Sequence, residues 1–242
     1  MRSGAALPSP ETKADHVRRM FGAIAPRYDL LNHLLSANRD RAWRRRAVDV
    51  LLARLARPDG VVLDSCAGTL DLAVELAGRR AFRGLVLGFD FAFPMLARGG
   101  GKATSLPIRP VCADALRLPL RDGACDAAMV AFGVRNLADL SAGIAEFARV
   151  LQAGAPLVIL EFTTPRWQPF RALYLGYFRR VLPLIGRLIS RHGSAYDYLP
   201  ASVLEFPEPD ALADQLAAAG FAQVRWESLT GGIVALHSAV RR

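Results

Sequence analysis

Three aspartates stand at the ends of short apolar stretches, and their positions suit the binding of a nucleoside. Asp64, Asp90 and Asp114 each close a run rich in aliphatic residues. If these runs are parallel strands, their carboxyl ends meet at one edge of a sheet, which is where such sheets bind ligands. Asp90 follows the loop residue Gly68 by about twenty residues, the spacing at which an acid accepts hydrogen bonds from both ribose hydroxyls. The alternative reading, that Asp90 and Asp114 are helix N-caps, stays open.

The loop after the first apolar run, in "VVLDSCAGTLDLAVELA", carries Leu70 where nucleotide-binding loops usually have glycine. Glycine there permits a positive φ or a close backbone approach, so we expect Leu70 to weaken cofactor binding. The chain has no G-x-x-x-x-G-K-[ST] loop, which argues against nucleoside triphosphates. Carboxylates with few loop donors suit a neutral or cationic cofactor, and this indicates S-adenosylmethionine.

The elements that must position these residues alternate between strand and helix. This order predicts an α/β fold with a mostly parallel sheet of about seven strands, covered on both faces. A C-terminal hairpin turns at Gly231 and Gly232. Strands are expected over 60–66, 84–90, 108–114, 126–132, 156–162, 222–230 and 232–240, and helices near 70–79, 92–99, 139–151 and 208–220.

The sequence divides into a short lead-in and one domain. Residues 1–14 show no periodicity and are expected to be disordered, whereas 15–242 form a single domain. Within it, helical spacing of apolar residues predicts N-terminal helices over 15–57. An aromatic stretch after the fifth strand, 165–205, is expected to be an insertion that faces the substrate and the membrane.

Composition limits the class of protein. The 242 residues are 52% hydrophobic and include neither a run of about 18 apolar residues nor a secretory signal, so we expect a cytoplasmic protein. The net charge of +9 is nearly all arginine and fits an anionic membrane, nucleic acid or plain solubility. No nucleic-acid recognition motif accompanies it, which disfavours nucleic acid. Cys66, Cys112 and Cys125 have no metal-site or disulfide spacing and are expected to be small core residues.

Several stretches resemble the ubiquinone and menaquinone biosynthesis C-methyltransferases, from about residue 17 to the end. These are "MFGAIAPRYDLLNHLLS", "AWRRRAV", "VLDSCAGTLDLA", "FPMLARG", "FGVRNL", "VLQAGAPLVILEFTTP", "YDYLPAS" and "AGF" with "LTGGIVALH". The resemblance implies a class I S-adenosylmethionine-dependent methyltransferase fold, Rossmann-like, and an enzyme that methylates a ring carbon of a polyprenylated quinol, with demethylmenaquinol as the leading candidate. It places Thr69, Asp90, Asp114 and Ala115 at the cofactor. Leu70 departs from the family pattern, as does Ala131, where relatives often have serine.

The implied chemistry needs a ring hydroxyl to lose its proton, because a phenol has a pKa near ~10. Arg135 is expected to stabilise the phenolate, and Asn136 to orient the ring oxygen. A base would come from Asp29, from His237 or from a water that they hold. The tyrosines expected to orient the substrate are Tyr28, Tyr196 and Tyr198.

Each of these roles has a structural alternative. His237 can be a satisfied core histidine, Tyr196 and Tyr198 can be packing residues, and Arg135 can pair with Asp139.

A polyprenyl tail requires access to the bilayer. Within 166–191 an apolar stripe at helical spacing is flanked by arginines, which predicts peripheral contact with an anionic membrane. A core helix with snorkelling arginines fits equally well. The stripe is Trp167, Phe170, Leu173, Tyr174, Tyr177 and Phe178, and its arginines are Arg171, Arg179 and Arg180.

The leading hypothesis is therefore a quinol C-methyltransferase. A degenerate relative that binds without turnover is a second hypothesis, motivated by Leu70 and Ala131. A methyltransferase for another aromatic metabolite is a third. The sequence leaves open the type of quinol, the tail length and whether the chain forms a homodimer.

Overall fold

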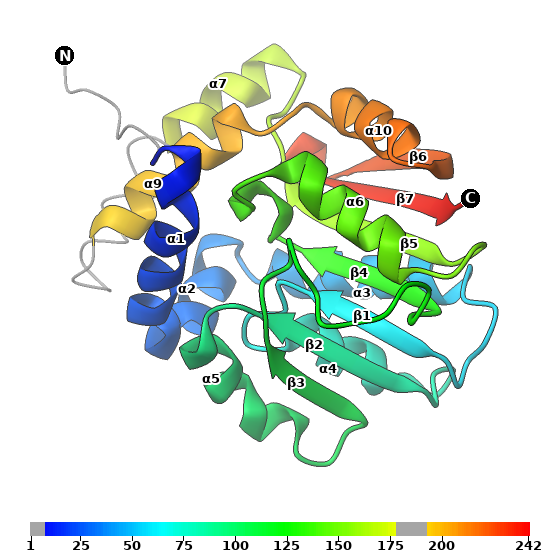
Figure 1. Cartoon of the computed structure of the whole chain (residues 1–242). Helices are drawn as coiled ribbons and strands as arrows, with labels where there is room; N and C mark the ends of the chain where they lie inside the picture. Colours follow the sequence, from blue (N-terminus) through cyan, green and yellow to red (C-terminus); the bar gives the residue numbers. More distant parts are fainter. Residues whose placement is uncertain (1–7, 178–192) are drawn as a thin grey trace.

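A seven-stranded sheet forms the centre of the protein in this computed structural model, which describes residues 8–177 and 193–242 (Figure 1). The strand order is β3-β2-β1-β4-β5-β7-β6; β7 runs antiparallel to its neighbours β5 and β6, and the pairs among β1 to β5 are parallel. This confirms the predicted α/β fold with a C-terminal hairpin. The strands are β1 Val61–Ser65, β2 Leu85–Asp90, β3 Ile108–Cys112, β4 Ala127–Ala131, β5 Pro156–Phe162, β6 Phe221–Leu229 and β7 Val234–Arg241.

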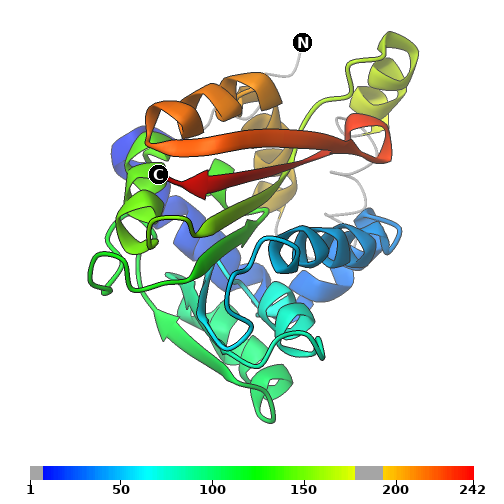
Figure 2. The ribbon, with the colours of Figure 1, turned by 90° about the vertical axis from the view of Figure 1, so that its right-hand side faces the viewer.

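Helices cover both faces of this sheet, which explains why its central strands are almost wholly apolar (Figure 2). One core cluster joins one face to the helices α3, α4 and α5, and a second joins the other face to α6 and α10. Their bounds are α3 Arg39–Leu52, α4 Asp71–Ala77, α5 Phe93–Ala103, α6 Leu140–Val150 and α10 Pro209–Ala218.

Two N-terminal helices lie across the carboxyl ends of the strands (Figure 1). They are α1 Pro10–Ile24 and α2 Tyr28–Leu35, linked by the short turn η1 Ala25–Arg27. The expected start of order at Asp15 is corrected, since α1 begins at Pro10, a residue type favoured at a first helical position. The Lys13 ammonium also donates to the backbone carbonyls of Arg135 (3.0 Å) and Leu137 (2.7 Å), which ties this first part of α1 to the sheet edge.

The insertion after β5 is helical in its described parts, α7 Gln168–Gly176 and α9 Gly193–Glu205. Of the residues in the predicted membrane stripe, Phe178, Arg179 and Arg180 lie outside the described residues. The hairpin turn η4 Thr230–Gly232 then joins β6 to β7 at the predicted glycines. No helix in the described ranges is long and apolar enough to cross a membrane.

Candidate active site

Two adjoining pockets open at the carboxyl ends of the strands, beneath α1 and α2. We call them the loop pocket, lined by the loops after β1 to β4, and the aromatic pocket, lined mainly by α1, α2, α3 and α7. Phe21, Tyr28 and Phe132 line both. Two ligands bound in these pockets would therefore meet across the same three rings.

Asp90 is the central acid of the loop pocket. Its Oδ1 accepts the backbone N–H of Ala92 and its Oδ2 that of Gly68, both at 2.8 Å. Gly68 presents its N–H from a left-handed backbone conformation with φ of +54°, which glycine adopts without strain. Each carboxylate oxygen keeps a further lone pair, so Asp90 can accept hydrogen bonds from two hydroxyl groups of a ligand. Burial raises the pKa of Asp90, and the two backbone donors only partly oppose it.

The other sequence candidates that line the loop pocket lie around Asp90. Asp114 caps its own turn, since its Oδ1 accepts the Leu116 N–H at 2.9 Å, and Ala115 and Ala131 stand beside the cavity. Asn136 also lines this pocket, although it was expected at the substrate ring. Its amide nitrogen lies 3.3 Å from the Phe132 carbonyl oxygen, and its Oδ1 has no partner within the described residues.

Leu70 adopts φ of +66° and yet leaves the loop pocket open. Its side chain is 0% exposed and packs into the core, away from the cavity. Space for it exists because two neighbours are glycines: a Cβ on Gly88 would come within 2.6 Å of Leu70 Cδ2, and one on Gly99 within 2.9 Å of its Cγ. The side chain on which the expected weakening of cofactor binding depends therefore lies outside the loop pocket.

Asp64 and Thr69 support the loop from behind and line neither pocket. Asp64 is buried in β1, and burial raises its pKa well above the ordinary value. The Thr69 hydroxyl donates to Asp29 Oδ1 at 2.6 Å. Their predicted contacts with the cofactor are thus corrected to indirect support.

Asp29 lies outside both pockets, so its predicted role as a base is wrong. Its Oδ2 pairs with Lys102 Nζ at 2.7 Å, and Lys102 also bridges to Asp71 at 2.5 Å. Burial alone would raise the pKa of Asp29, but the bonds from Lys102 and Thr69 hold it below the ordinary value. Asp29 fixes the loop instead.

His237 also lies away from both pockets, in the last strand. Its Nε2 is 2.9 Å from the Pro209 carbonyl oxygen, and its ring lies beside Trp226. Burial lowers its pKa, which keeps the imidazole neutral. The alternative reading as a core histidine is the correct one.

Arg135 lines the aromatic pocket, and its partner is Glu161 rather than the Asp139 considered from the sequence. Its guanidinium donates to Glu161 Oε1 at 2.8 Å and to the Phe132 carbonyl at 2.5 Å, and it lies 5.4 Å from the centre of the Phe162 ring. Asp139 instead caps α6. Arg135 Nε is buried and has no partner within the described residues.

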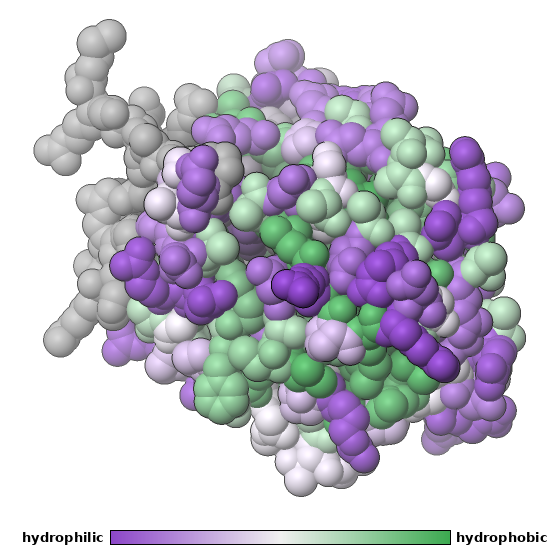
Figure 3. Space-filling view, in the orientation of Figure 1, coloured by the Kyte–Doolittle hydropathy of each residue, from purple (hydrophilic) through white to green (hydrophobic). Residues whose placement is uncertain are grey.

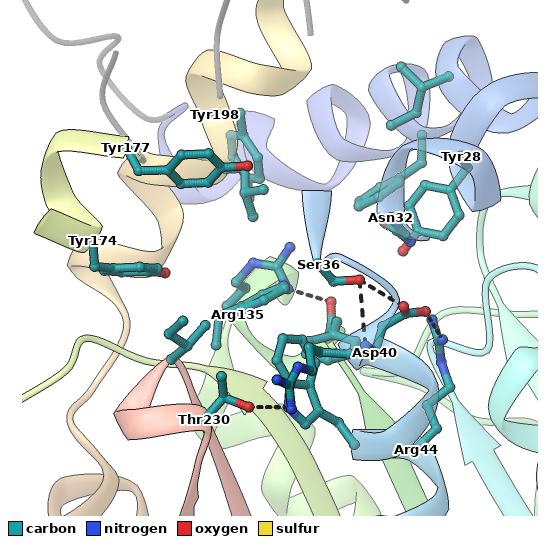
Figure 4. A pocket seen from close by; sticks show the side chains of 18 of the residues that line it. Tyr28, Asn32, Ser36, Asp40, Arg44, Arg135, Tyr174, Tyr177, Tyr198 and Thr230 are labelled. Atoms are coloured by element: carbon teal, nitrogen blue, oxygen red, sulfur yellow. Dashed lines mark hydrogen bonds and ion pairs between the residues drawn. The ribbon is translucent and has the colours of Figure 1, made fainter. Parts of the chain in front are cut away.

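A polar cluster from α3 and the turn before it forms another wall of the aromatic pocket, and sequence reasoning missed it (Figure 4). Asp40 and Arg44 are four residues apart on α3, which places them on one face of that helix, and Ser36 lies in the preceding turn. The spacing of Asp40 and Arg44 was the available signal. Asn32 of α2 lies in the same pocket, and Thr230 accepts a hydrogen bond from the Trp43 indole at 2.8 Å.

Tyrosines supply much of the remaining wall. Tyr28 and Tyr198 line the aromatic pocket as expected, whereas only the backbone of Tyr196 lies within the described structure, in α9. Tyr174 and Tyr177 point into the same cavity (Figure 4), although the predicted stripe had them facing the membrane. The stripe is therefore divided between two sides of α7: these tyrosines line the pocket, while Trp167 and Leu173 are each 70% exposed.

Comparison with known proteins gives the family. The model of the ubiE/COQ5 methyltransferase family matches residues 9–241. A demethylmenaquinone methyltransferase of Thermus thermophilus is 51% identical over 90% of this chain and 98% of its own length. One from Deinococcus radiodurans is 47% identical, over 93% and 92%, and a ubiquinone/menaquinone biosynthesis C-methyltransferase of a Geobacter species is 44% identical, over 93% and 96%.

Solved structures support the fold alone. The [4+2]-cyclase SpnF has a TM-score of 0.68 at 17% identity and covers 99% of both chains. A possible histamine N-methyltransferase of Thermotoga maritima has a TM-score of 0.63 at 15% identity, over 93% of this chain and 99% of its own. The match over nearly the whole sequence, together with relatives that align over nine-tenths or more of their own length, shows that the chain belongs to the ubiE/COQ5 methyltransferase family.

Proposed function

We propose that the protein transfers the methyl group of S-adenosylmethionine to a ring carbon of demethylmenaquinol. The observation that carries the proposal is the pair of adjoining pockets, one built around the buried acid Asp90 and the other around aromatic rings. The relatives at 51% and 47% identity are named demethylmenaquinone methyltransferases, which favours a naphthoquinol over a benzoquinol.

The loop pocket has the charge that this cofactor needs. Asp90 and Asp114 line it, and within the described part of the chain neither lysine, arginine nor histidine does. A pyrophosphate would find no counter-charge there, whereas a sulfonium would. When bound, S-adenosylmethionine supplies an electrophilic methyl group, and the residues that would hold it are Asp90 at the ribose and Asp114 with Ala115 at the adenine.

The aromatic pocket suits a fused, mostly apolar ring that carries oxygens. Rings and aliphatic side chains form most of its surface, and Arg135 supplies a positive charge that the pair with Glu161 holds in place. Because guanidinium remains protonated, Arg135 acts on the developing phenolate as a donor and not as a base. Its fixed position means that little reorganisation is needed as the negative charge forms.

Membrane attachment would bring the prenyl tail to this pocket. Trp167 and Leu173 on α7, and Leu30 and Leu34 on α2, are exposed apolar side chains on helices whose other residues line the aromatic pocket. Such side chains insert into a lipid interface. On the face shown in Figure 3, hydrophilic residues are spread among apolar ones and form no single band.

A methyl-transfer assay tests the function. The purified protein is incubated with radiolabelled S-adenosylmethionine and either a demethylmenaquinol or a demethylated benzoquinol, both with short prenyl tails. We expect label in the methylated naphthoquinol. If calorimetry detects binding of S-adenosylmethionine but neither quinol is labelled, the non-catalytic alternative is favoured. If a parallel reaction labels another aromatic metabolite and neither quinol, the hypothesis of a methyltransferase for that metabolite is favoured.

Liposome co-sedimentation tests the membrane contact. Replacing Trp167 and Leu173 with serine should reduce binding to anionic vesicles severalfold, while the same change at two exposed uncharged residues that line neither pocket, Gln168 and Gln152, serves as the matched control. Equal binding by both variants would show that Trp167 and Leu173 do not contact the membrane.

A further inference from the structure

The reaction requires a group that accepts the proton of the ring hydroxyl, and neither Asp29 nor His237 reaches a pocket. Among the described residues that line the aromatic pocket, Asp40 is the one carboxylate. We propose that Asp40 is the general base of the methyl transfer and takes the hydroxyl proton directly or through the Ser36 hydroxyl. This inference rests on the proposed function.

The hydrogen bonds of Asp40 leave one acceptor position toward the ligand. The side chain is only 4% exposed, and its Oδ2 meets both His33 Nδ1, at 2.8 Å, and the Arg44 guanidinium. Oδ1 accepts the Ser36 hydroxyl at 2.7 Å. A carboxylate oxygen has two lone pairs, so Oδ2 is saturated while Oδ1 retains one. Ser36 and Asp40 both line the pocket, where a ring hydroxyl would donate (Figure 4).

The charges around Asp40 keep it ionised. His33 faces it from α2 and Ser36 from the turn after α2. Arg44 faces it from its own helix, and Asp71 of α4 lies 3.5 Å from Arg44. Arg39 also lines the pocket from α3, and Arg135 lines it from the turn after β4. Burial raises the pKa of Asp40, but Ser36, Arg44 and His33 together hold it below the ordinary value.

A weak base suffices because the hydroxyl becomes acidic during the reaction. As the ring carbon forms its bond to the methyl group, the C–S bond breaks and its electron pair stays on sulfur. The O–H bond breaks, its proton passes to Asp40 and its electrons make the ring oxygen a carbonyl. Loss of the hydrogen on the methylated carbon, as a proton to solvent, restores the aromatic ring while the oxygen regains a proton from Asp40. One proton is released for each methyl group transferred.

Other groups in or near the pocket are less suited. Glu161 lines neither pocket and is occupied by Arg135 and by the backbone N–H of Phe162. Burial raises the pKa of Tyr28 and Tyr198, and a protonated tyrosine does not accept this proton readily. Arg135 stays protonated.

The test compares wild type with Asp40→Asn, using the short-tailed demethylmenaquinol at saturating cofactor. At pH 7 we expect kcat to fall about 100-fold or more, the usual contribution of a positioned base. The variant's kcat should then rise about tenfold per pH unit from pH 7 to 9, because the hydroxyl, with a pKa near ~10, must ionise in solvent. The wild-type profile should stay flat over this range. A purely structural role of Asp40 would not change the slope.

Asp71→Asn is the matched control, since Asp71 also pairs with Arg44 but lines neither pocket. It should keep kcat within about threefold of wild type and keep a flat profile. Calorimetry with S-adenosylmethionine checks that each variant is folded. If Asp40→Asn binds no cofactor because Arg44 is left buried without its partner, Asp40→Asn combined with Arg44→Met replaces it, and the same slope is expected.

Two outcomes would overturn the proposal: an Asp40→Asn variant that keeps more than about a fifth of the wild-type kcat, or one whose profile is as flat as that of wild type. Wild type without methyl transfer to any quinol would refute the proposed function itself, and the role of Asp40 with it. The two failures are therefore distinguishable.

Discussion

The two pockets each contain a buried aspartate, but the structure shifts the pKa values of the two in opposite directions. In the loop pocket, Asp90 is held by neutral backbone N–H groups, and burial raises its pKa. In the aromatic pocket, Asp40 is buried as well, which by itself would raise its pKa. The hydrogen bonds and charges of Ser36, Arg44 and His33 have the larger effect and lower the pKa of Asp40. Neutral donors satisfy a carboxylate without neutralising it, whereas a guanidinium does both.

This difference matches the ligands proposed for the two pockets. Asp90 has no cationic partner among the described residues, so a cationic sulfonium cofactor supplies the missing counter-charge. Asp40 already has Arg44, so the aromatic pocket can receive a neutral quinol without leaving an uncompensated charge. The contrast between the pockets can be tested by changing one at a time.

The largest expected effect concerns the donor in the aromatic pocket. Arg135→Met combined with Glu161→Gln should lower kcat about 100-fold, because a fixed donor at a developing oxyanion typically contributes that much. Cofactor affinity, measured by calorimetry, should not change. The double variant is needed because Arg135→Ala alone would leave the buried Glu161 unpaired, at a cost of about 3–5 kcal/mol. Unchanged turnover would remove the role of Arg135.

The corresponding change in the loop pocket is Asp90→Asn. Asparagine keeps one acceptor oxygen, so one hydrogen bond to a charged group is lost; such a bond contributes about 1.5–3 kcal/mol, and S-adenosylmethionine binding should weaken about 10- to 100-fold. Asp114→Asn is the control, since this side chain is exposed and the effect should stay below about tenfold. Equal weakening by both variants, measured by calorimetry, would contradict the central position of Asp90.

Leu70→Gly separates loop stability from cofactor binding. Losing a buried leucine costs about 2–5 kcal/mol, and relief of the positive φ returns about 1 kcal/mol, so the free energy of unfolding in urea should fall by about 2 kcal/mol. The affinity for S-adenosylmethionine should change less than about threefold.

Gly88→Ala provides the companion measurement for Leu70. In the wild-type background it should lower the free energy of unfolding by about 1–3 kcal/mol, because the new Cβ would collide with Leu70 Cδ2. In the Leu70→Gly background it should have little effect, because that side chain is absent. Cofactor binding that tightens tenfold in Leu70→Gly would restore the idea of an obstructing side chain.

The smallest effect is a pH dependence of cofactor binding. The raised pKa of Asp90 means that its carboxylate protonates as the pH falls through that value, so S-adenosylmethionine affinity should weaken by at most about tenfold per pH unit. Its contribution to folding has the opposite sign, being greatest below the ordinary aspartate pKa of about 3.9 and decreasing as the pH rises through the raised value. Calorimetry across pH tests this, and Asp90→Asn should abolish the dependence.

The local pattern of the sequence was enough for the sheet, its helices and the acids at its edge. Apolar runs and helical spacing depend on neighbours along the chain, and each predicted strand is present. Asp90 and Asp114 could be placed because the end of a parallel strand is a fixed position in this fold. That they bind the cofactor remains a prediction.

Only the tertiary structure decided where the other side chains point. Asp29 on α2 and Asp40 on α3 are eleven residues apart, yet Asp29 fixes the loop after β1 and Asp40 lines the aromatic pocket. Leu70 turns into the core because Gly88 and Gly99, distant in sequence, leave room for it. The sequence by itself determined the elements and the sheet edge, since these follow from local periodicity. The packing of α2, α3 and α7 across that edge decided which side chains meet a ligand, because such contacts join residues that no local pattern relates.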